Sequence, residues 1–191
     1  MPLLRKPSPN VIQRFLAAQA QLEFSYAAVG TTATTPPAGF VVDHTRAKLG
    51  EGERVFLAAK AALTQWEHFR LGWVEAGPSD TVIQTGSCVA VVARVMGFWW
   101  LNACRIVYVV NETDAVARFG FAYGTLPGHA ELGEERFMVE WDRARNAVWY
   151  DILAFSRPNH PLARLGYPLT RKTQRRFAQD SVRVMQRATR L

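Results

Sequence analysis

Residues 73 to 155 are divided into short apolar runs by turn residues, and this pattern restricts the possible fold more than any other feature of the chain. Each run is rich in β-branched or aromatic residues, which favour strands. Gly, Pro, Asn and Asp separate several of the runs, as in an antiparallel meander. The runs predicted to form strands are Trp73–Ala76, Thr81–Gln84, Cys88–Val95, Trp99–Val110, Ala115–Tyr123, Arg136–Trp141 and Val148–Phe155.

Three segments outside this region place apolar residues at the three- and four-residue spacing of an amphipathic helix. They predict helices over Ser8–Gln21, Leu49–Arg70 and Leu169–Leu191. Apolar and polar residues alternate over Leu22–Tyr26, which predicts one further strand. The run from Gly30 to Gly39 is expected to form a loop, because Thr, Pro and Gly cluster there.

Helices and strands are therefore segregated along the chain, which predicts an α+β fold rather than a parallel α/β fold. We expect an antiparallel sheet wrapped around the long C-terminal helix. A length of 191 residues suits a single domain. Within it, residues 1–21 would form an N-terminal helical extension, and residues 22–191 would form the sheet-and-helix core.

Composition excludes several classes of protein. A hydrophobic content of 49% is too high for an intrinsically disordered chain. The two cysteines, Cys88 and Cys104, lie inside apolar runs, which argues against a disulfide scaffold and against a CxxC site. No apolar run reaches the ~18 residues of a membrane span, and the N-terminus lacks a signal-peptide pattern, so we expect a cytoplasmic protein.

One motif, FGFAYGTLPGHAELGEE, spans residues 119–135 and gives the chain a resemblance to a known family. Shorter blocks at residues 102–108, 155–158 and 174–177 accompany it. Together they resemble a family of small bacterial and plant proteins known as a domain of unknown function, over roughly residues 22–190. The order of elements resembles the helix-grip fold of the START and Bet v 1-like superfamily. That resemblance implies an apolar cavity between the sheet and the last helix, while the family itself implies no particular activity.

The densest polar cluster lies in the same motif and contains His129, Glu131 and Glu134, which are the candidate catalytic residues. Histidine titrates near neutrality and a carboxylate can orient it, as general acid–base chemistry requires. His129 and Glu131 are two residues apart, so they would share one face of a strand. The alternative is a polar hairpin with solvated glutamates, in which His129 bonds the backbone of the turn.

Candidate ligand-binding residues come from the predicted strands. Arg105 and Arg118 lie among apolar residues, where a buried charge is costly unless it is paired. Each would form a structural ion pair or anchor a carboxylate or phosphate of a ligand. The partners considered for Arg105 are Glu134, Glu135, Glu140 and Asp151. The aromatic residues would form the core or line a cavity. The residues proposed to contact a ligand are Arg105, Asn102, Arg118, Tyr123, Thr125, Trp99 and Trp141.

No motif in the sequence indicates a metal or a cofactor. The histidines His44, His68, His129 and His160 are isolated and form no HxH, HxxxH or HExxH pattern. The Gly-rich run at residues 49–52 lacks the GK[ST] of a phosphate loop. We therefore expect neither a metal nor a cofactor.

The predicted C-terminal helix carries much of the net charge of +7, with seven Lys or Arg residues between Arg171 and Arg190 against one acid, Asp180. Nucleic-acid binding is disfavoured, because no helix-turn-helix, zinc-finger or RNP-type motif accompanies the charge. Arginine stems often cover apolar surface while their charged groups stay in water, so a solvated face is the favoured interpretation. Contact with an anionic membrane or partner surface is the alternative.

Two functions remain after these exclusions. The favoured function is binding of an apolar or aromatic small molecule in a cavity between the sheet and the C-terminal helix. The alternative is a small-molecule enzyme that uses His129 and Glu131 as an acid–base pair. The fold does not choose between them, because one scaffold can host carriers and catalysts.

Overall fold

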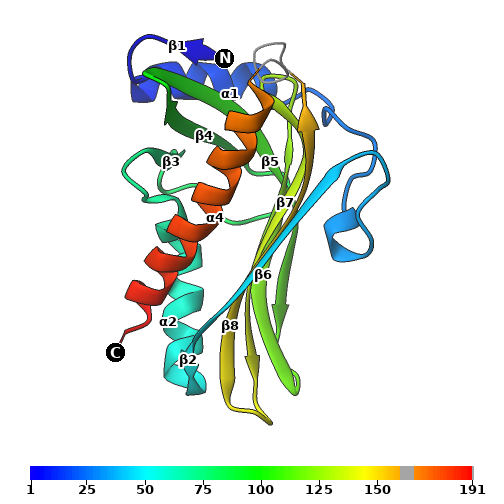
Figure 1. Ribbon diagram of the computed structural model, residues 1–191, viewed down its shortest axis with the longest axis vertical. Coiled ribbons are helices and arrows are strands. Elements are labelled where there is room, and N and C mark those ends of the chain that lie inside the picture. Colours follow the sequence, from blue (N-terminus) through cyan, green and yellow to red (C-terminus); the bar gives the residue numbers. More distant parts are fainter. Residues whose placement is uncertain (160–165, 191) are drawn as a thin grey trace.

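The computed structural model describes residues 1–159 and 166–190. Its main element is a strongly curved antiparallel sheet, and the long helix α4 (Tyr167–Ala188) crosses the concave face of this sheet (Figure 1). This confirms the predicted α+β, helix-grip architecture. The other helices are α1 (Pro9–Gln19) and α2 (Gly52–Thr64), with short 3-10 turns η1 (Thr31–Ala33) and η2 (Glu67–Phe69).

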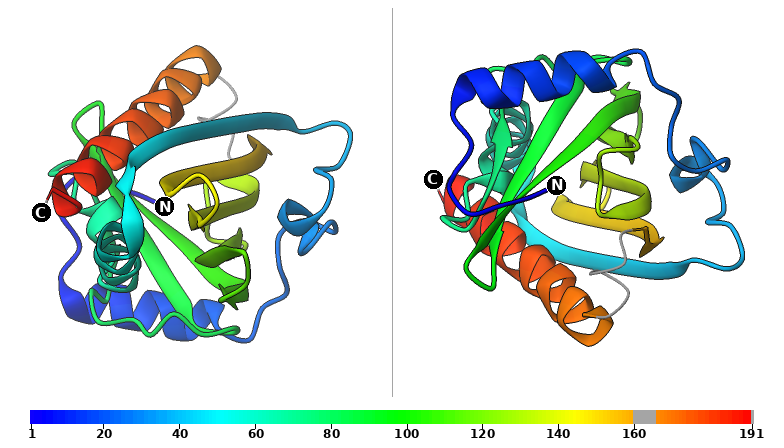
Figure 2. Two further views of the ribbon diagram at one scale, coloured as in Figure 1. Left: turned by 90° about the horizontal axis from the view of Figure 1, so that it is seen from below. Right: turned by 90° about the horizontal axis from the view of Figure 1, so that it is seen from above.

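The sheet has the strand order β2-β8-β7-β6-β5-β4-β3, with a short β1 paired to β5. All of its neighbouring pairs are antiparallel. Seen along the long axis of the molecule, it curls like an open barrel with α2 and α4 beside the opening (Figure 2). The strands are β1 (Pro2–Leu3), β2 (Val41–Glu51), β3 (Val74–Gly77), β4 (Cys88–Val95), β5 (Phe98–Glu112), β6 (Val116–Thr125), β7 (Glu131–Asp142) and β8 (Ala147–Pro158).

The main core lies between the concave face of the sheet and helices α2 and α4. Successive residues of β7 point to opposite faces of the sheet, so every second side chain of this strand contributes to the main core. Phe137 and Val139 are fully buried on the concave side. Met185 of α4 is also fully buried, and the Ser181 hydroxyl lies 2.9 Å from the Tyr150 hydroxyl of β8.

A second, smaller core lies on the other face of β4 and β5, where α1 covers the sheet. Ile12 and Leu16 of α1 pack there with Val92 and Leu101. The predicted N-terminal extension is thus packed against the sheet. Within the described residues, no helix combines the length and the apolar character needed to cross a membrane.

Two predicted strands are absent from the described structure. The segment Leu22–Tyr26 crosses the end of β6, where both the backbone nitrogen and the hydroxyl of Ser25 bind the Thr125 carbonyl at 3.0 Å. Thr81–Gln84 forms no strand, because Thr81 binds the Pro78 carbonyl and accepts the indole N–H of Trp66.

The predicted helix over Leu49–Arg70 is shorter at both ends. Strand β2 continues through Glu51 before α2 begins. Trp66 then adopts a left-handed φ of 57°, which ends the helical path, and η2 follows. The last helix begins at Tyr167 and ends at Ala188, close to the prediction, although Leu191 lies outside the described residues.

Candidate functional site

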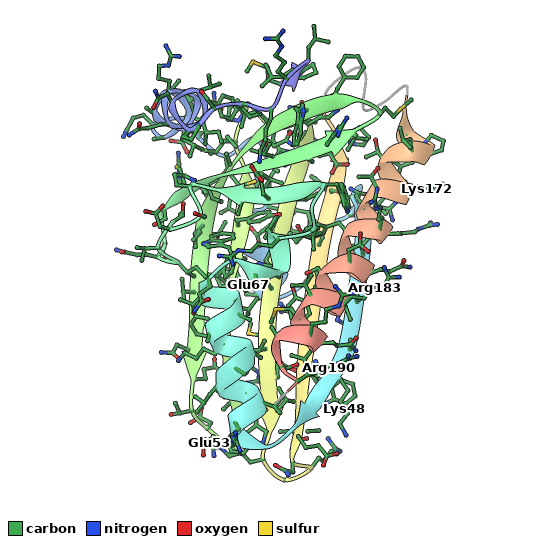
Figure 3. The ribbon with its side chains drawn as sticks, turned by 90° about the vertical axis from the view of Figure 1, so that its left-hand side faces the viewer. Lys48, Glu53, Glu67, Lys172, Arg183 and Arg190 are labelled. Atoms are coloured by element: carbon green, nitrogen blue, oxygen red, sulfur yellow. The ribbon has the colours of Figure 1, made fainter. Side chains whose placement is uncertain are left out.

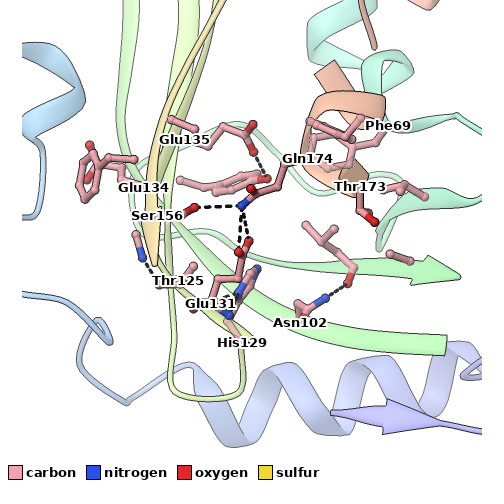
Figure 4. A pocket seen from close by; sticks show the side chains of 18 of the residues that line it. Phe69, Asn102, Thr125, His129, Glu131, Glu134, Glu135, Ser156, Thr173 and Gln174 are labelled. Carbon is pink, nitrogen blue, oxygen red and sulfur yellow. Dashed lines mark hydrogen bonds between the residues drawn. The ribbon is translucent and has the colours of Figure 1, made fainter. Parts of the chain in front are cut away.

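A pocket of about 180 Å³ lies between the concave face of the sheet and the amino-terminal half of α4 (Figure 4). One part of its wall is apolar and includes Phe69, Trp73, Val74, Val91, Ala93 and Phe177. Another part is polar and includes Asn102, Tyr123, Thr125, His129, Glu131, Glu135, Ser156, Thr173 and Gln174. The cavity predicted between sheet and helix is therefore present, and it has both an apolar and a polar side.

The period of two along β7 determines which carboxylates reach this pocket. Glu131 and Glu135 share the parity of the core residue Phe137, so they point toward α4. Glu134 has the opposite parity and leaves the strand on the other side (Figure 4). Sequence reasoning gave Glu134 a catalytic role and did not select Glu135, although strand alternation alone separates them.

Glu131 is held in place by α4. Its two carboxylate oxygens lie 2.8 and 2.9 Å from Nε2 of Gln174, which also donates to the Ser156 hydroxyl at 2.9 Å. The Gln174 carbonyl oxygen accepts from Arg171 at 2.6 Å, which fixes the orientation of the amide. Burial raises the pKa of Glu131 above its usual value, and Gln174 and Arg171 partly oppose this shift. Gln174 belongs to the sequence block at residues 174–177, and it is not among the site residues predicted from the sequence.

Glu135 is the acid most strongly perturbed by the pocket. Its carboxylate accepts one hydrogen bond, 2.7 Å from the hydroxyl of Tyr123 on β6. Burial raises the pKa of Glu135 to about 7, with Glu131 and Asp43 adding repulsion, while the Tyr123 hydrogen bond acts in the opposite direction. Glu135 therefore changes charge near neutral pH, and it lines the pocket where a ligand would meet it.

His129 lines the same pocket in a neutral state. Its Nδ1 lies 3.0 Å from the backbone nitrogen and 3.1 Å from the backbone carbonyl oxygen of Glu131, so the ring contacts the backbone of Glu131 rather than its carboxylate. Burial lowers the pKa of His129 to about 4. The structure thus brings His129 and Glu131 together, but the expected side-chain pair is not formed.

The carboxylate of Glu134 lies on the convex face of the sheet, where other parts of the chain bind it. Its carboxylate accepts hydrogen bonds from the Tyr26 hydroxyl at 2.6 Å, the Gly30 backbone at 2.7 Å, and both the backbone and the hydroxyl of Thr32. The side chain is 2% exposed. Glu134 is among the residues that line the pocket, but its carboxylate oxygens bind Tyr26, Gly30 and Thr32 and so attach the segment 26–32 to the sheet.

Asn102, Tyr123 and Thr125, three of the residues predicted to contact a ligand, line the pocket. Asn102 also fixes the turn before β7, because its side chain donates to the Val91 carbonyl and accepts from the Ala130 backbone. The Thr125 hydroxyl accepts from the Gly133 backbone at 3.0 Å. These contacts set the position of the His129 turn at the edge of the pocket.

Arg105 lies outside the pocket, and the acidic partners considered for it are not the groups it binds. Its guanidinium donates to the carbonyls of Ala20 and Leu22 at 2.8 and 2.7 Å and stacks over Phe24 at 5.2 Å. The even–odd alternation of β5 explains this, because Arg105 points away from the face of Asn102 and Cys104. Backbone carbonyls satisfy the charge where a carboxylate was expected.

Arg118, Trp99 and Trp141 also lie away from the pocket. Arg118 forms ion pairs with Glu112 and Glu140 on the convex face, at 2.9 and 3.1 Å. Trp99 packs with the α1 core, and Trp141 is buried and packs near Phe56. Arg118 thus forms structural ion pairs between strands, which is one of the two roles expected for it from the sequence.

The cations of α4 lie mainly on its outer side, as Lys172 and Arg183 illustrate (Figure 3). Arg171 is an exception, because it points to β2 and binds Asp43 with two contacts of 2.5 Å. Arg183 pairs with Asp180 of the same helix at 2.7 Å. Contact of this face with an anionic surface stays a proposal. In the described part of the chain, no three His, Cys, Asp or Glu residues converge as a metal site.

Comparison with known proteins gives one family. The family model called Domain of unknown function (DUF1990) matches residues 25–184. The chain is 38% identical over 202 residues to a UPF0548 protein of Dictyostelium discoideum, covering 96% of this chain and 94% of that protein. It is also 38% identical over 199 residues to a UPF0548 protein of Deinococcus radiodurans, covering 97% and 98%.

Among solved structures, the hypothetical protein jhp0584 of Helicobacter pylori overlaps this chain with a TM-score of 0.52 and 13% identity, over 88% of this chain and 99% of that one. At this identity the similarity shows a shared fold alone. Ara h 8.0201 gives a TM-score of 0.44 with 11% identity, over 77% of this chain and 99% of that one. Human STARD10 gives 0.41 with 7% identity, over 93% and 81%.

Proposed function

The chain belongs to the family Domain of unknown function (DUF1990), and from its own pocket we propose that it binds a small apolar or aromatic molecule between the sheet and α4. The observation that carries this proposal is the divided wall of the pocket, with Phe69, Trp73 and Phe177 on one part and convergent polar groups on another. Ligand sites commonly combine an apolar lining with a few polar groups that fix orientation.

The volume of the pocket sets the size of the ligand. An engineered apolar cavity of ~150 Å³ in another protein binds benzene. The pocket of about 180 Å³ thus suits a single ring with a short polar substituent. A long lipid chain would need a larger cavity.

The first prediction tests the pocket by filling it. Ala154 lines the pocket from β8, while the adjacent Leu153 points to the convex face. We expect Ala154→Phe to lose a small molecule that the natural protein retains in native mass spectrometry after purification from its own host. Added toluene should raise the melting temperature of the natural protein and leave that of Ala154→Phe unchanged.

Leu153→Phe is the matched control, since it adds the same ring on the other face of the same strand. It should retain the molecule and the toluene response. Circular dichroism verifies that both variants are folded. Equal ligand retention in Ala154→Phe and the natural protein, or no copurified molecule together with no response to toluene, would contradict the proposed function.

Acid–base catalysis is a second candidate, and the geometry favours Glu135 as its residue rather than His129. Glu135 lines the pocket and has its pKa raised to about 7, whereas His129 has its pKa lowered to about 4 and is neutral at pH 7. A general acid or base works best when its pKa lies near the operating pH. A reaction at this site would therefore show a rate inflection near pH 7 that Glu135→Gln removes.

A further inference from the structure

The two carboxylates that face the pocket form no ion pair in the described parts of the chain, although the charge of Arg171 acts on Glu131. Neither Glu131 nor Glu135 takes part in an ion pair within residues 1–159 and 166–190. Arg171, on the helix above them, is bound to Asp43 and to the Gln174 carbonyl. Glu131 therefore has an amide partner and Glu135 a phenol partner, and both partners are uncharged.

The remaining polar groups of the pocket do not supply positive charge. His129 contacts the backbone of Glu131 through Nδ1, and burial lowers its pKa to about 4, so the ring is uncharged at pH 8. Asn102 uses its amide on Val91 and Ala130, and Thr125 uses its hydroxyl on Ser25 and Gly133. A half-buried carboxylate without an ion-pair partner is partly desolvated at some cost, and an opposite charge brought by a ligand offsets that cost.

We propose that the ligand is a small amine with an apolar or aromatic body, whose ammonium group lies between Glu131 and Glu135 and whose body contacts Phe69, Trp73 and Phe177. This inference rests on the proposed function and names the chemical class of its ligand. The ammonium would donate to oxygens that accept only uncharged donors in the chain itself. A ligand carboxylate or phosphate would instead be repelled by both glutamates.

The test compares three single-ring probes that differ in charge: 2-phenylethylamine, its neutral analogue 2-phenylethanol, and the anion phenylacetate. Binding is measured by isothermal titration calorimetry at about pH 8, where Glu135 is ionised. We expect the amine to bind at least ~10-fold more tightly than the alcohol, because its ammonium adds a Coulombic attraction to the carboxylates that a neutral hydroxyl lacks. Phenylacetate should bind most weakly.

Two variants assign the effect to the pocket. Glu135→Gln keeps the shape of the side chain, removes its charge, and should bring amine affinity close to that of the alcohol. Glu140→Gln removes the same charge from the same strand, but Glu140 lies on the convex face, paired with Arg46 and Arg118. Glu140→Gln should keep the full preference for the amine.

The outcomes separate this inference from the proposed function. Equal affinity for amine and alcohol, with both lost in Ala154→Phe, overturns the amine inference while the pocket still binds apolar molecules. Tighter binding of phenylacetate, or a preference for the amine that survives Glu135→Gln, also overturns it. If no probe binds and Ala154→Phe matches the natural protein in every measurement, the inference and the proposed function both fail.

Discussion

The adjacent residues Glu134 and Glu135 differ in how much their charge is stabilised. Glu134 accepts hydrogen bonds from Tyr26, Gly30 and Thr32, which supply a complete set of donors to a buried carboxylate. Glu135 accepts one, from Tyr123. The charge of Glu134 is stabilised by hydrogen bonds that hold the fold together. The charge of Glu135 is less well stabilised, and Glu135 is the residue that faces the pocket.

Glu135→Gln should raise the stability of the protein above pH 7. The pKa of Glu135 is about 7 in the folded chain and 4.5 ordinarily, so the folded state binds the proton more tightly. The contribution of this group to the free energy of unfolding is therefore present below pH 4.5 and is lost as the pH rises through 7. Glutamine avoids this loss, which is on the order of 3 kcal/mol at pH 8.

Urea denaturation at several pH values checks this prediction as a difference between variant and natural protein. The difference is needed because the pKa of half-buried His129 is about 4 and that of buried His68 about 3, so both histidines remove stability as the pH falls below 6.5. Those contributions are common to both proteins and cancel. Parallel stability curves over pH 4.5 to 8 would show that Glu135 is not the titrating group.

At the scale of elements, Glu134 fastens η1 and the segment before it to the convex face of β7. Close packing accompanies this attachment, because a Cβ placed on Gly124 would lie 2.1 Å from the Tyr26 hydroxyl. Glycine at this motif position therefore leaves room for the tyrosine that binds Glu134. Motif residues on the convex face of the sheet thus attach the segment 26–32. Motif residues on the concave face line the pocket.

We expect Glu134→Gln to destabilise the protein by about 3 kcal/mol, because an amide nitrogen would face donors that need an acceptor. Denaturant unfolding measures the loss. Glu140→Gln on the same strand and face is the control, and it should cost at most about 1 kcal/mol because its ion pairs are partly exposed. A Glu134→Gln protein as stable as this control would mean that the loop is held by other contacts.

Several elements could be predicted from the sequence because their patterns are local. Short runs of β-branched and aromatic residues between turn residues predicted β4 through β8, and the three-to-four spacing predicted α4. The segment Leu22–Tyr26 also alternates, yet its hydrogen bonds run to Thr125 across the end of β6, which no local pattern records. The same limit applies to the site: His129 and Glu131 were recognisable in the motif, but the contact of Gln174 with Glu131 depends on how α4 crosses the sheet.

At the scale of the whole molecule, α4 is attached in two ways. Its amino-terminal half lies over the pocket and is held mainly by polar contacts, through Arg171 to Asp43 and Gln174 to Glu131 and Ser156. Its second half is buried in the core through Ser181 and Met185. Polar contacts at a pocket edge are weaker restraints than buried apolar packing, because water can replace them.

The amino-terminal half of α4 should therefore open more readily than the second half. In hydrogen exchange followed by mass spectrometry, amides around Thr173–Phe177 should exchange faster than those around Ser181–Met185. Arg171→Gln should accelerate exchange in the first half alone, because it removes the charged contact with Asp43.

A pocket ligand should slow exchange in the same half by contacting Phe177. The control variant Arg183→Gln alters only an ion pair on the outer face of the helix, so it should exchange like the natural protein. Uniform exchange along α4, unchanged by Arg171→Gln and by ligand, would show that the helix opens as one unit.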